Sequence, residues 1–286
     1  MTTIGVVVLS QGTRPVELGH CLDSLRAQTG VELDILVVGN GWEPTGLGPG
    51  VRGHGLVENV GIPEGRNVGA KLTTGELIFF FDDDAWIPEP DVLSRIAALF
   101  ADRPRLGEAQ PRVCDPDGTT LRRWVPRVPV GDPTRPGPAR TTAEGVTIVR
   151  RAAFEQLGGW AGEFFYGHEG IDLAWRMYDA GWDVWYAGDI AVHHPATDPA
   201  RHAEFYRRNA KNRVWAARRN LPWPVLVAYL AVWTAITMAR LARQPKAALV
   251  WWAGFVEGWR TDPGARHPMR WSTVARLTRL GQPPII

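Results

Sequence analysis

The sequence predicts an α/β fold in which helices flank a mostly parallel β-sheet. Two observations support this prediction. Short β-branched or aromatic runs alternate with helical patterns through roughly the first hundred residues, and these runs end at Gly, Asn, Ser or Asp. The 286 residues are 45% hydrophobic and 22% charged, which is typical of a globular protein with one large domain or two unequal ones.

The first three elements form a βαβ unit. Ile4 to Leu9 is a β-branched run that we interpret as a first strand rather than a signal peptide. A helical pattern and a second apolar run, residues 35–38, follow it. Ligands of such sheets bind beyond the carboxyl ends of the strands, so we expect Ser10, Gln11 and Asn40 at the binding edge. The predicted helix buries Leu18, Cys21, Leu22 and Leu25.

A glycine-rich stretch, residues 59–75, leads into the next strand. Gly61 and Gly65 permit a tight loop in which the backbone can approach a ligand closely. Arg66 and Asn67 then enter a short helix, and the Arg66 guanidinium can contact a phosphate or a nearby carboxylate. Because this stretch directly precedes an acidic strand, it is a candidate part of the binding site.

The most informative stretch is residues 76–88. Leu77 to Phe81 predicts a buried strand, and Asp82, Asp83 and Asp84 follow it. Three neighbouring carboxylates repel one another unless a cation joins them, and their oxygen atoms suit Mg²⁺ or Mn²⁺, which commonly also bind a substrate diphosphate. Because strand residues alternate in direction, Asp82 and Asp84 can share one ion while Asp83 faces another partner. The alternative is an acidic turn that caps the next helix.

The middle of the chain continues the alternation less regularly. Residues 87–100 predict a helix, whereas residues 111–140 are rich in proline and glycine and predict a surface loop near the active site. A strand at residues 146–149 and a helix at residues 152–157 follow, and a last strand is predicted at residues 182–187.

Two pairs of titratable residues flank this last strand. Glu169 and Asp172 lie in the first turn of a predicted helix, where they either stabilise the helix dipole or supply a general base for a hydroxyl group. His193 and His194 follow the strand, where they are either hydrogen-bonded core residues or metal ligands.

Taken in order, these motifs resemble those of the family 2 glycosyltransferases, which have the Rossmann-like GT-A fold. The resemblance covers roughly residues 3–220. The matching segments are Val-Val-Val-Leu-Ser, Asp-Ile-Leu-Val-Val-Gly-Asn-Gly, Arg-Asn-Val-Gly, Phe-Phe-Asp-Asp-Asp-Ala, Leu-Gly-Gly-Trp, Tyr-Gly-His-Glu-Gly-Ile-Asp-Leu-Ala-Trp-Arg and Val-His-His. The resemblance implies an inverting hexosyl- or deoxyhexosyltransferase that uses a nucleotide-diphosphate sugar. It also implies a divalent ion, Mg²⁺ or Mn²⁺, at an Asp-X-Asp motif.

The resemblance also implies roles for individual residues. The family usually has an Asp that contacts the nucleotide base where this chain has Gly39, and a Glu-Asp pair where it has Glu169-Gly170. We therefore expect Glu169 to act as the general base, with Asp172 as the second candidate. The expected donor-binding residues are Ser10, Gln11, Asn40, Asn59, Arg66, Asn67, Asp82 and Asp83, and the expected metal ligands are Asp82, Asp84, His193 and His194.

The C-terminal residues differ in composition, so we expect a GT-A domain at residues 1–215 and a helical region at residues 216–286. From residue 201 onward the chain has 13 Arg and 2 Lys against 3 acidic residues, and half of the 14 Trp. It contains two apolar segments, residues 225–239 and 247–259. The first is shorter than the roughly 20 residues that span a bilayer, and its Arg and Trp neighbours favour a helix in the membrane interface. The alternative is that both segments cover the core.

The sequence thus predicts a metal-dependent, inverting glycosyltransferase, cytoplasmic and peripheral at the inner face of the cell membrane. A glycan or lipid-linked molecule is the expected acceptor, and an anionic membrane surface is a more suitable partner for the basic tail than nucleic acid. Cys21 and Cys114 are expected to be reduced thiols. The alternatives are a non-catalytic scaffold that binds sugar nucleotides or glycans, and a metal-dependent nucleotidyltransferase. Formation of a homodimer is left open.

Overall fold

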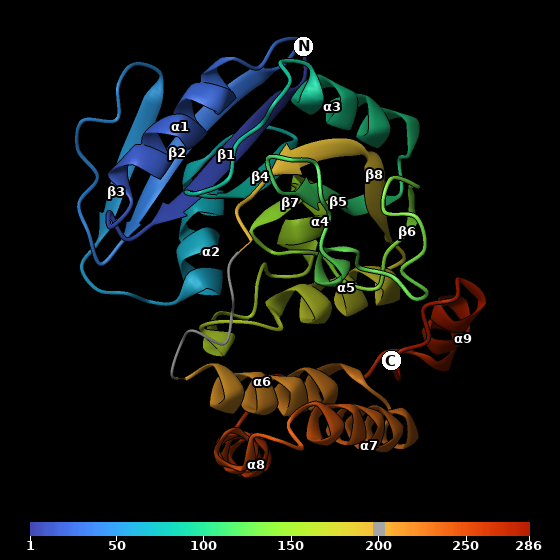
Figure 1. Ribbon diagram of the computed structural model, residues 1–286. Helices are drawn as coiled ribbons and strands as arrows, with labels where there is room; N and C mark the ends of the chain where they lie inside the picture. The colour runs from blue at the N-terminus through green and yellow to red at the C-terminus, as the bar shows by residue number, and fades with distance from the viewer. Residues whose placement is uncertain (197–203) are drawn as a thin grey trace.

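A mixed β-sheet forms the centre of the molecule (Figure 1). The computed structural model describes residues 1–196 and 204–286. Within these residues the sheet has eight strands in the order β3-β2-β1-β4-β7-β5-β8-β6. The strands β3, β2, β1 and β4 run parallel to one another, and β5 runs parallel to β8. Strand β7 is antiparallel to its neighbours β4 and β5, and β6 is antiparallel to β8. The strands are β1 (Thr3–Ser10), β2 (Glu32–Asn40), β3 (Val51–Leu56), β4 (Leu77–Asp82), β5 (Leu106–Cys114), β6 (Gly137–Pro138), β7 (Val146–Arg150) and β8 (Asp183–His193). The mostly parallel α/β fold is therefore confirmed.

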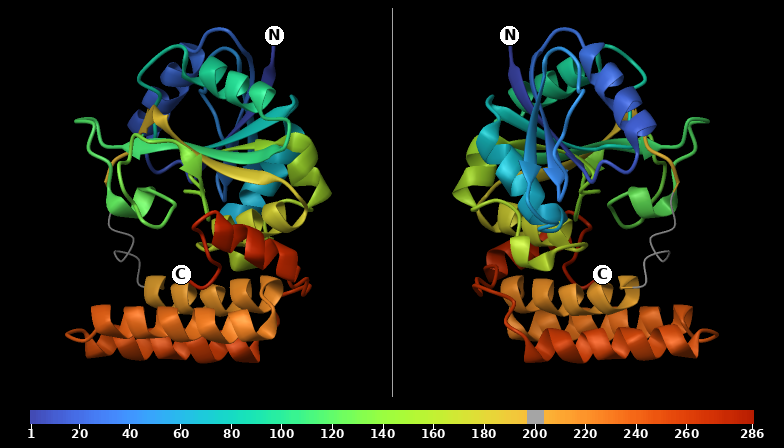
Figure 2. Two further views of the ribbon diagram at one scale, coloured as in Figure 1. Left: turned by 90° about the vertical axis from the view of Figure 1, so that its right-hand side faces the viewer. Right: turned by 90° about the vertical axis from the view of Figure 1, so that its left-hand side faces the viewer.

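Helices cover both faces of this sheet (Figures 1 and 2). Phe79 and Phe81 of β4 pack with α1 and α3, whereas Ile78 and Phe80 pack with α2, α4 and α5, because successive strand residues point to opposite faces. The helices are α1 (Pro15–Arg26), α2 (Ile62–Leu72), α3 (Val92–Asp102), α4 (Arg151–Gln156), α5 (Glu169–Asp179), α6 (Phe205–Asn220), α7 (Trp223–Arg240), α8 (Pro245–Arg260) and α9 (Trp271–Arg279), with short 3₁₀ turns η1 (Arg122–Trp124) and η2 (Gly162–Phe164).

Strong hydrophobic periodicity predicted the local structure correctly. The buried residues of α1 are the four that the pattern indicated, and β4 buries its whole apolar run. The helix predicted from residue 87 begins only at Val92, because Pro88 and Pro90 interrupt the backbone hydrogen bonding before it. Both cysteines are buried free thiols.

One strand in the interior of the sheet, β5, was missed, and residues 111–114 belong to it rather than to the predicted loop. Its sequence is polar, yet Glu108 and Gln110 are fully buried. Thr142 Oγ1 donates to Glu108 at 2.6 Å, and Gln110 bonds to the backbone of Trp124 and Ala143 at 2.8 and 2.6 Å. These partners come from a later loop, so a pattern of apolar residues could not reveal the strand.

The helices α6, α7 and α8 form a layer on one side of the sheet (Figure 2). α6 lies between α5 and the pair α7 and α8, and its buried residues join the same hydrophobic core as α5. The sequence boundary expected between residues 215 and 216 falls inside this helix. α9 returns to α5, where Thr273 Oγ1 donates to Asp179 at 2.6 Å. The helical layer is thus continuous with the packing of the sheet.

Candidate active site

A cleft of about 1100 Å³ opens beyond the carboxyl ends of β1, β2 and β4. Parallel strands that end together bring distant loops to one edge, and these loops form one side of the cleft. The other side is formed by α6 and α7. Residues lining the cleft from the strand ends include Ser10, Gln11, Asn40, Asn59, Arg66, Asp82, Asp83 and Asp84, and those from the two helices include Phe205, Arg208, Asn209, Arg213, Tyr229 and Trp233.

Asp82, Asp84 and His194 converge in this cleft. One ligand atom from each lies within 4.8 Å of the others. His194 Nε2 is 3.6 Å from Asp82 Oδ2 and 3.3 Å from Asp84 Oδ1. Burial by itself lowers the pKa of His194, but hydrogen bonds and charge from the two carboxylates raise it to about 10. Two carboxylates and an imidazole thus form a site that favours a positive charge.

Asp83 faces away from this cluster, toward β1. Ser10 Oγ donates to its Oδ2 at 2.6 Å, and Arg14 Nη2 donates to its Oδ1 at 2.6 Å. Arg14 also bonds to Asp84 through Nη1. Burial raises the pKa of Asp83 to about 6, against the lowering effect of Ser10 and Arg14. Arg14 is a part of the site that the sequence patterns did not single out, since it lies in a loop without a motif of its own.

Arg66 and Gly145 position Asp82. Arg66 is 2% exposed, and its Nη2 donates to Asp82 Oδ1 at 2.7 Å. Burial by itself raises the pKa of Asp82, but the charges of Arg66 and His194 hold it well below its ordinary value. A Cβ atom at residue 145 would lie 1.9 Å from Asp82 Oδ2, so only glycine leaves room for this carboxylate. The carboxylate is therefore held ionised.

His193 does not join the cluster. It pairs with Trp86 in a backbone bridge, and its ring packs edge-on against the indole at 5.4 Å between centroids. Burial lowers its pKa, as does Arg112. Neighbouring strand residues point to opposite faces, so His193 and His194 cannot both reach one ion. Both histidines were expected to bind metal, but of the two only His194 lies in the cluster with Asp82 and Asp84.

Asp172 is not placed to act as a base. It is fully buried and does not line the cleft. Arg176 Nε donates to its Oδ2 at 2.8 Å, while Arg219 Nε and Asn220 Nδ2 donate to its Oδ1 at 3.0 and 2.7 Å. Burial by itself raises the pKa of Asp172, but Arg176 and Arg219 hold it below its ordinary value. Asp172 therefore ties α5 to α6.

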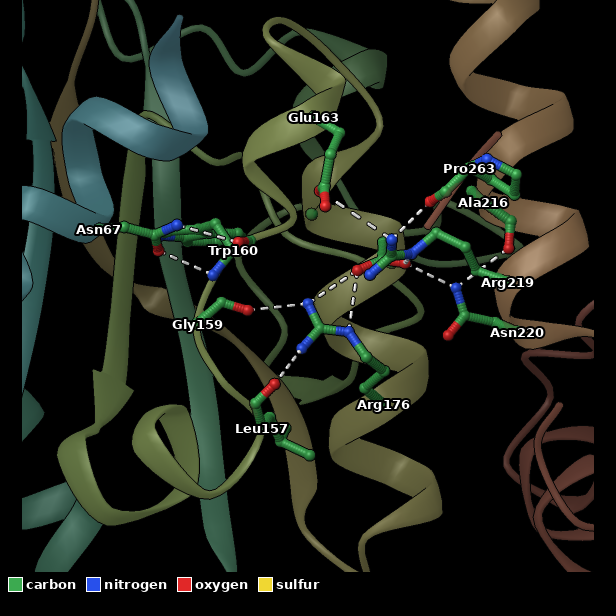
Figure 3. Close-up of polar contacts among 12 residues, drawn as sticks. Asn67, Leu157, Gly159, Trp160, Glu163, Arg176, Ala216, Arg219, Asn220 and Pro263 are labelled. Atoms are coloured by element: carbon green, nitrogen blue, oxygen red, sulfur yellow. Dashed lines mark hydrogen bonds and ion pairs between the residues drawn. The ribbon is translucent and has the colours of Figure 1, made fainter. Parts of the chain in front are cut away.

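Figure 3 shows the surroundings of these arginines. Arg176 also donates to the carbonyl oxygens of Leu157 and Gly159, at 2.9 Å each. The same view shows Asn67, an expected donor ligand, turned to the backbone of Trp160, to which it bonds at 2.9 and 3.0 Å. Asn67 lines a second cavity of about 700 Å³ and not the main cleft. The structure thus separates Asn67 from Arg66, because consecutive helical residues point about 100° apart.

The other expected donor-binding residues have distinct positions. Gln11 is exposed at the cleft, whereas the amide of Asn40 is engaged by the loop after β3. Asn40 Nδ2 donates to Asn59 Oδ1 at 2.9 Å, and its Oδ1 accepts from Val60 N at 2.9 Å. Asn59 Oδ1 also accepts from Gly61 N at 2.9 Å. Asn40 and Asn59 therefore shape the loop around the cleft.

A pair of carboxylates, Glu144 and Glu169, lies near Arg66. Glu144 lines the cleft and accepts from Gly170 N at 2.9 Å. Glu169 is buried behind it, and its Oε2 has no partner in the described part of the chain. Burial raises the pKa of Glu169 to about 8, and the charge of Glu144 adds to this. The sequence patterns missed Glu144; its one signal was the Glu-Gly step before the strand that pairs with β4.

Comparison with known sequences identifies the family. The sequence model of Glycosyl transferase family 2 matches residues 12–158, just over half of the chain. The O-antigen biosynthesis protein RfbC of Myxococcus xanthus is 25% identical over 187 residues. This match covers 56% of the present chain and only 14% of RfbC.

Solved structures share the fold. GalNAc-T7, in a crystal structure with UDP, GalNAc and Mn²⁺, has a TM-score of 0.64 at 15% identity, over 99% of this chain and 58% of that one. The mannosyltransferase PcManGT from Pyrobaculum calidifontis, in complex with GDP-Man and Mn²⁺, has a TM-score of 0.59 at 17% identity. This match covers 96% of the present chain and 78% of PcManGT. S. aureus TarS 1-349 has a TM-score of 0.52 at 19% identity, and the match covers 74% of the present chain and 65% of TarS 1-349. The strand order, the cleft and the family match agree: the chain belongs to glycosyl transferase family 2 and has the GT-A fold.

Proposed function

We propose that this glycosyltransferase is metal-dependent and inverting, and that it takes its sugar from a nucleoside-diphosphate donor. The observation that carries the proposal is the convergence of Asp82, Asp84 and His194 at the end of β4. The volume of the cleft that they line, about 1100 Å³, is sufficient for a ligand the size of a cofactor. Two proteins of the same fold were solved with nucleotides and Mn²⁺, one with UDP and one with GDP-Man.

The cluster fits a divalent cation. Two carboxylates and an imidazole are ligands that Mn²⁺ accepts, and Mg²⁺ can use the two carboxylates together with water and phosphate oxygens. Gly145 leaves the space that the Asp82 carboxylate occupies. When bound there, the ion supplies positive charge for the diphosphate that leaves the sugar.

Arg66 is suited to hold the donor diphosphate beside that site. One of its nitrogens, Nη2, bonds to Asp82, while Nε and Nη1 are buried without a partner among the described residues. Guanidinium groups bind phosphate oxygens through paired N–H donors, so these two free donors suit the diphosphate. Arg66 would thereby stabilise the leaving group as its charge develops.

Glu144 is the carboxylate best placed to accept the proton of the acceptor hydroxyl. It lines the cleft, whereas the Glu169 expected from the sequence lies behind it. We propose that Glu169 stays protonated and supports Glu144, because two neighbouring buried carboxyls do not both ionise readily. A single displacement with inversion needs a leaving-group site and one base, and the cleft offers both.

We further propose that the protein binds the cytoplasmic face of the membrane through α7 and α8. α7 is long and apolar enough by composition to cross a membrane, and 22% of it is buried. Both helices expose apolar side chains, and basic residues flank them. The exposed apolar residues are Trp223, Val227, Leu249, Val250, Trp252, Val256 and Trp259. Trp and Arg together favour the membrane interface. At this location the enzyme could reach a lipid-linked or envelope glycan acceptor. The similarity to an O-antigen biosynthesis protein also supports such an acceptor.

The test is an assay of UDP-, GDP- and dTDP-sugars with Mn²⁺, with Mg²⁺ or with EDTA. We expect one donor to release nucleoside diphosphate in a metal-dependent reaction, and Asp84→Asn to lower the rate at least ~100-fold. Asp102→Asn, which changes an exposed Asp at the end of α3, is the matched control. Release of pyrophosphate would instead indicate a nucleotidyltransferase. Equal rates for wild type and Asp84→Asn would contradict the assigned metal site.

A further inference from the structure

A second polar cluster lines the cleft on the side of α6 and α7. Arg140, in the loop before β7, and Arg213, on α6, both face the Trp233 ring. Their guanidinium carbons lie 5.7 and 4.2 Å from its centroid. Arg213 Nη1 donates to Tyr229 Oη at 3.2 Å. His168, which precedes α5, lies near Arg213, whose charge together with burial lowers the pKa of His168 well below its ordinary value. The cluster thus joins two guanidinium groups, an imidazole and two aromatic rings.

The two cations have no carboxylate partner within residues 1–196 and 204–286. Arg213 is 8% exposed, and its Nε has no hydrogen-bond acceptor among these residues. The same holds for Nε and Nη1 of Arg140 and for Nε2 of His168. Glu204, an acid that lines this side, forms an ion pair with Arg207 at 3.5 Å. Burial of an unpaired charge is costly unless a ligand supplies the opposite charge.

This cluster shares the cleft with Asp82 but lies on the side of α6 and α7. The main charges acting on Asp82 are Arg66 and His194, whereas Tyr229 and Arg213 act on Arg140. The carboxylates Glu144 and Glu169 respond to Arg66, and Glu169 directly follows His168. The start of α5 is therefore a neighbour of both groups, since Arg66 acts on Glu169 and Arg213 acts on His168. A molecule held by these arginines would lie in the same cleft as Glu144, the proposed base.

We propose that Arg140 and Arg213 bind an oxyanion, a phosphate or a carboxylate, that is part of the acceptor. Binding of the oxyanion does not depend on the proposed function; only the identification of the bound molecule as the acceptor does. Two guanidinium groups with free N–H donors match the oxygen atoms of such a group, and Trp233 and Tyr229 hold the guanidiniums in place. The acceptor specificity of the enzyme then depends on negative charge at a position remote from the reacting hydroxyl.

The first test is titration of the full-length protein with inorganic pyrophosphate in the absence of divalent metal. We expect Arg140→Gln and Arg213→Gln each to weaken pyrophosphate binding at least tenfold, and Arg213→Lys to weaken it less. Arg243→Gln, which removes an exposed charge after α7, should leave it unchanged. Arg213→Gln also removes the hydrogen bond to Tyr229 and the contact with Trp233, so the melting temperature of each variant is measured, and the half-buried Arg140 provides a second variant. Unchanged affinity in both Gln variants would overturn the proposal.

The second test separates this site from the donor site. Affinity for nucleoside diphosphate with Mn²⁺ should be the same in wild type and in both Gln variants; a parallel loss would place the two arginines at the donor and refute an acceptor site. Failure of every nucleotide sugar would count against the proposed function, while the pyrophosphate titration would still report on the arginines. Displacement of pyrophosphate by farnesyl phosphate indicates a lipid phosphate, and displacement by glucuronate an acidic sugar. Displacement by neither would contradict the acceptor assignment.

Discussion

Buried carboxylates near the cleft have too few partners to ionise freely. Glu108 of β5 accepts one hydrogen bond, from Thr142, and its Oε2 has no partner in the described residues. Glu169 is in a similar position, with its Oε2 unpartnered. Burial raises the pKa of both groups to about 8. Each of these acids therefore links the protein's stability or activity to pH.

Glu108 should make the fold less stable as the pH rises. The folded protein keeps this proton up to about pH 8, while the unfolded chain loses it near its ordinary value of 4.5. Below pH 4.5 both states are protonated and the stability is complete; between 4.5 and 8 the free energy of unfolding falls. Glu108→Gln removes this loss, so its stability relative to wild type should grow by roughly 1.4 kcal/mol per pH unit in this range.

Urea unfolding of wild type and Glu108→Gln at pH 5 and pH 8 measures the effect. Glu58→Gln, which changes an exposed carboxylate, should show the same pH dependence as wild type. A difference between Glu108→Gln and wild type that does not vary with pH would mean that Glu108 is ionised in the folded protein.

Single substitutions can also show which carboxylate, Glu144 or Glu169, acts as the general base. Glu144→Gln should lower kcat by about 100-fold or more, because general-base catalysis contributes on that scale, and leave donor KM nearly unchanged. Glu169→Gln should have a smaller effect, since the side chain is proposed to be protonated already. Steady-state kinetics on both variants, with Glu58→Gln as control, would detect this. The reverse order of effects would restore Glu169 as the base.

At the scale of elements, α6 fixes the loop before α5. Asn212 on α6 is fully buried, and its Nδ2 donates to the carbonyl oxygens of Phe164, Tyr166 and Gly167 at 2.8 to 3.0 Å. Asn212→Leu keeps the branched shape of the side chain but leaves these carbonyls unpaired, so we expect a loss of about 1–3 kcal/mol of stability. Amide hydrogen exchange should rise in residues 164–167. Unchanged exchange there would show that Asn212 does not hold the loop.

Close backbone contact joins α8 to α6. A Cβ atom at Gly254 would lie 2.1 Å from the carbonyl oxygen of Arg207, and one at Gly258 would lie 2.8 Å from that of Lys211. Gly254→Ala should therefore lower the melting temperature, since α8 must move away, at a cost of about 1–3 kcal/mol. The same change at Gly19 of α1, which has open space around it, should stabilise the protein by up to ~1 kcal/mol. Effects of the same sign at both positions would contradict the close packing.

At the scale of the whole molecule, α7 and α8 lie on the side of the helical layer that faces away from the sheet (Figure 2), where we propose the membrane contact. Trp252→Glu places a charge on the exposed side of α8, and we expect it to weaken sedimentation with anionic vesicles by tenfold or more. Val16→Glu, an equally apolar exposed position on α1, is the control and should bind as wild type does. Binding should also fall with added salt and with neutral lipids. Equal binding of both variants would exclude this surface as the contact.

Some elements could be predicted from local residue patterns, whereas others depended on contacts between distant parts of the chain. Residue patterns were sufficient for α1, β4, α5 and α7, where apolar spacing repeats within one element. They were insufficient for β5, whose buried Glu108 is partnered by Thr142 from a loop that follows much later. They also did not separate His193 from His194, and they missed Glu144, since each choice depends on which side chain faces the cleft.

The amino-acid sequence by itself determined the α/β fold class, the family and the acidic strand end, because these depend on composition and spacing along the chain. Only the tertiary structure decided which groups meet: His194 with Asp82 and Asp84, Arg14 with Asp83, and Arg140 and Arg213 beside Trp233. The physical reason is that burial and charge partners, which set the protonation and ligand preference of a side chain, come from elements remote in the sequence.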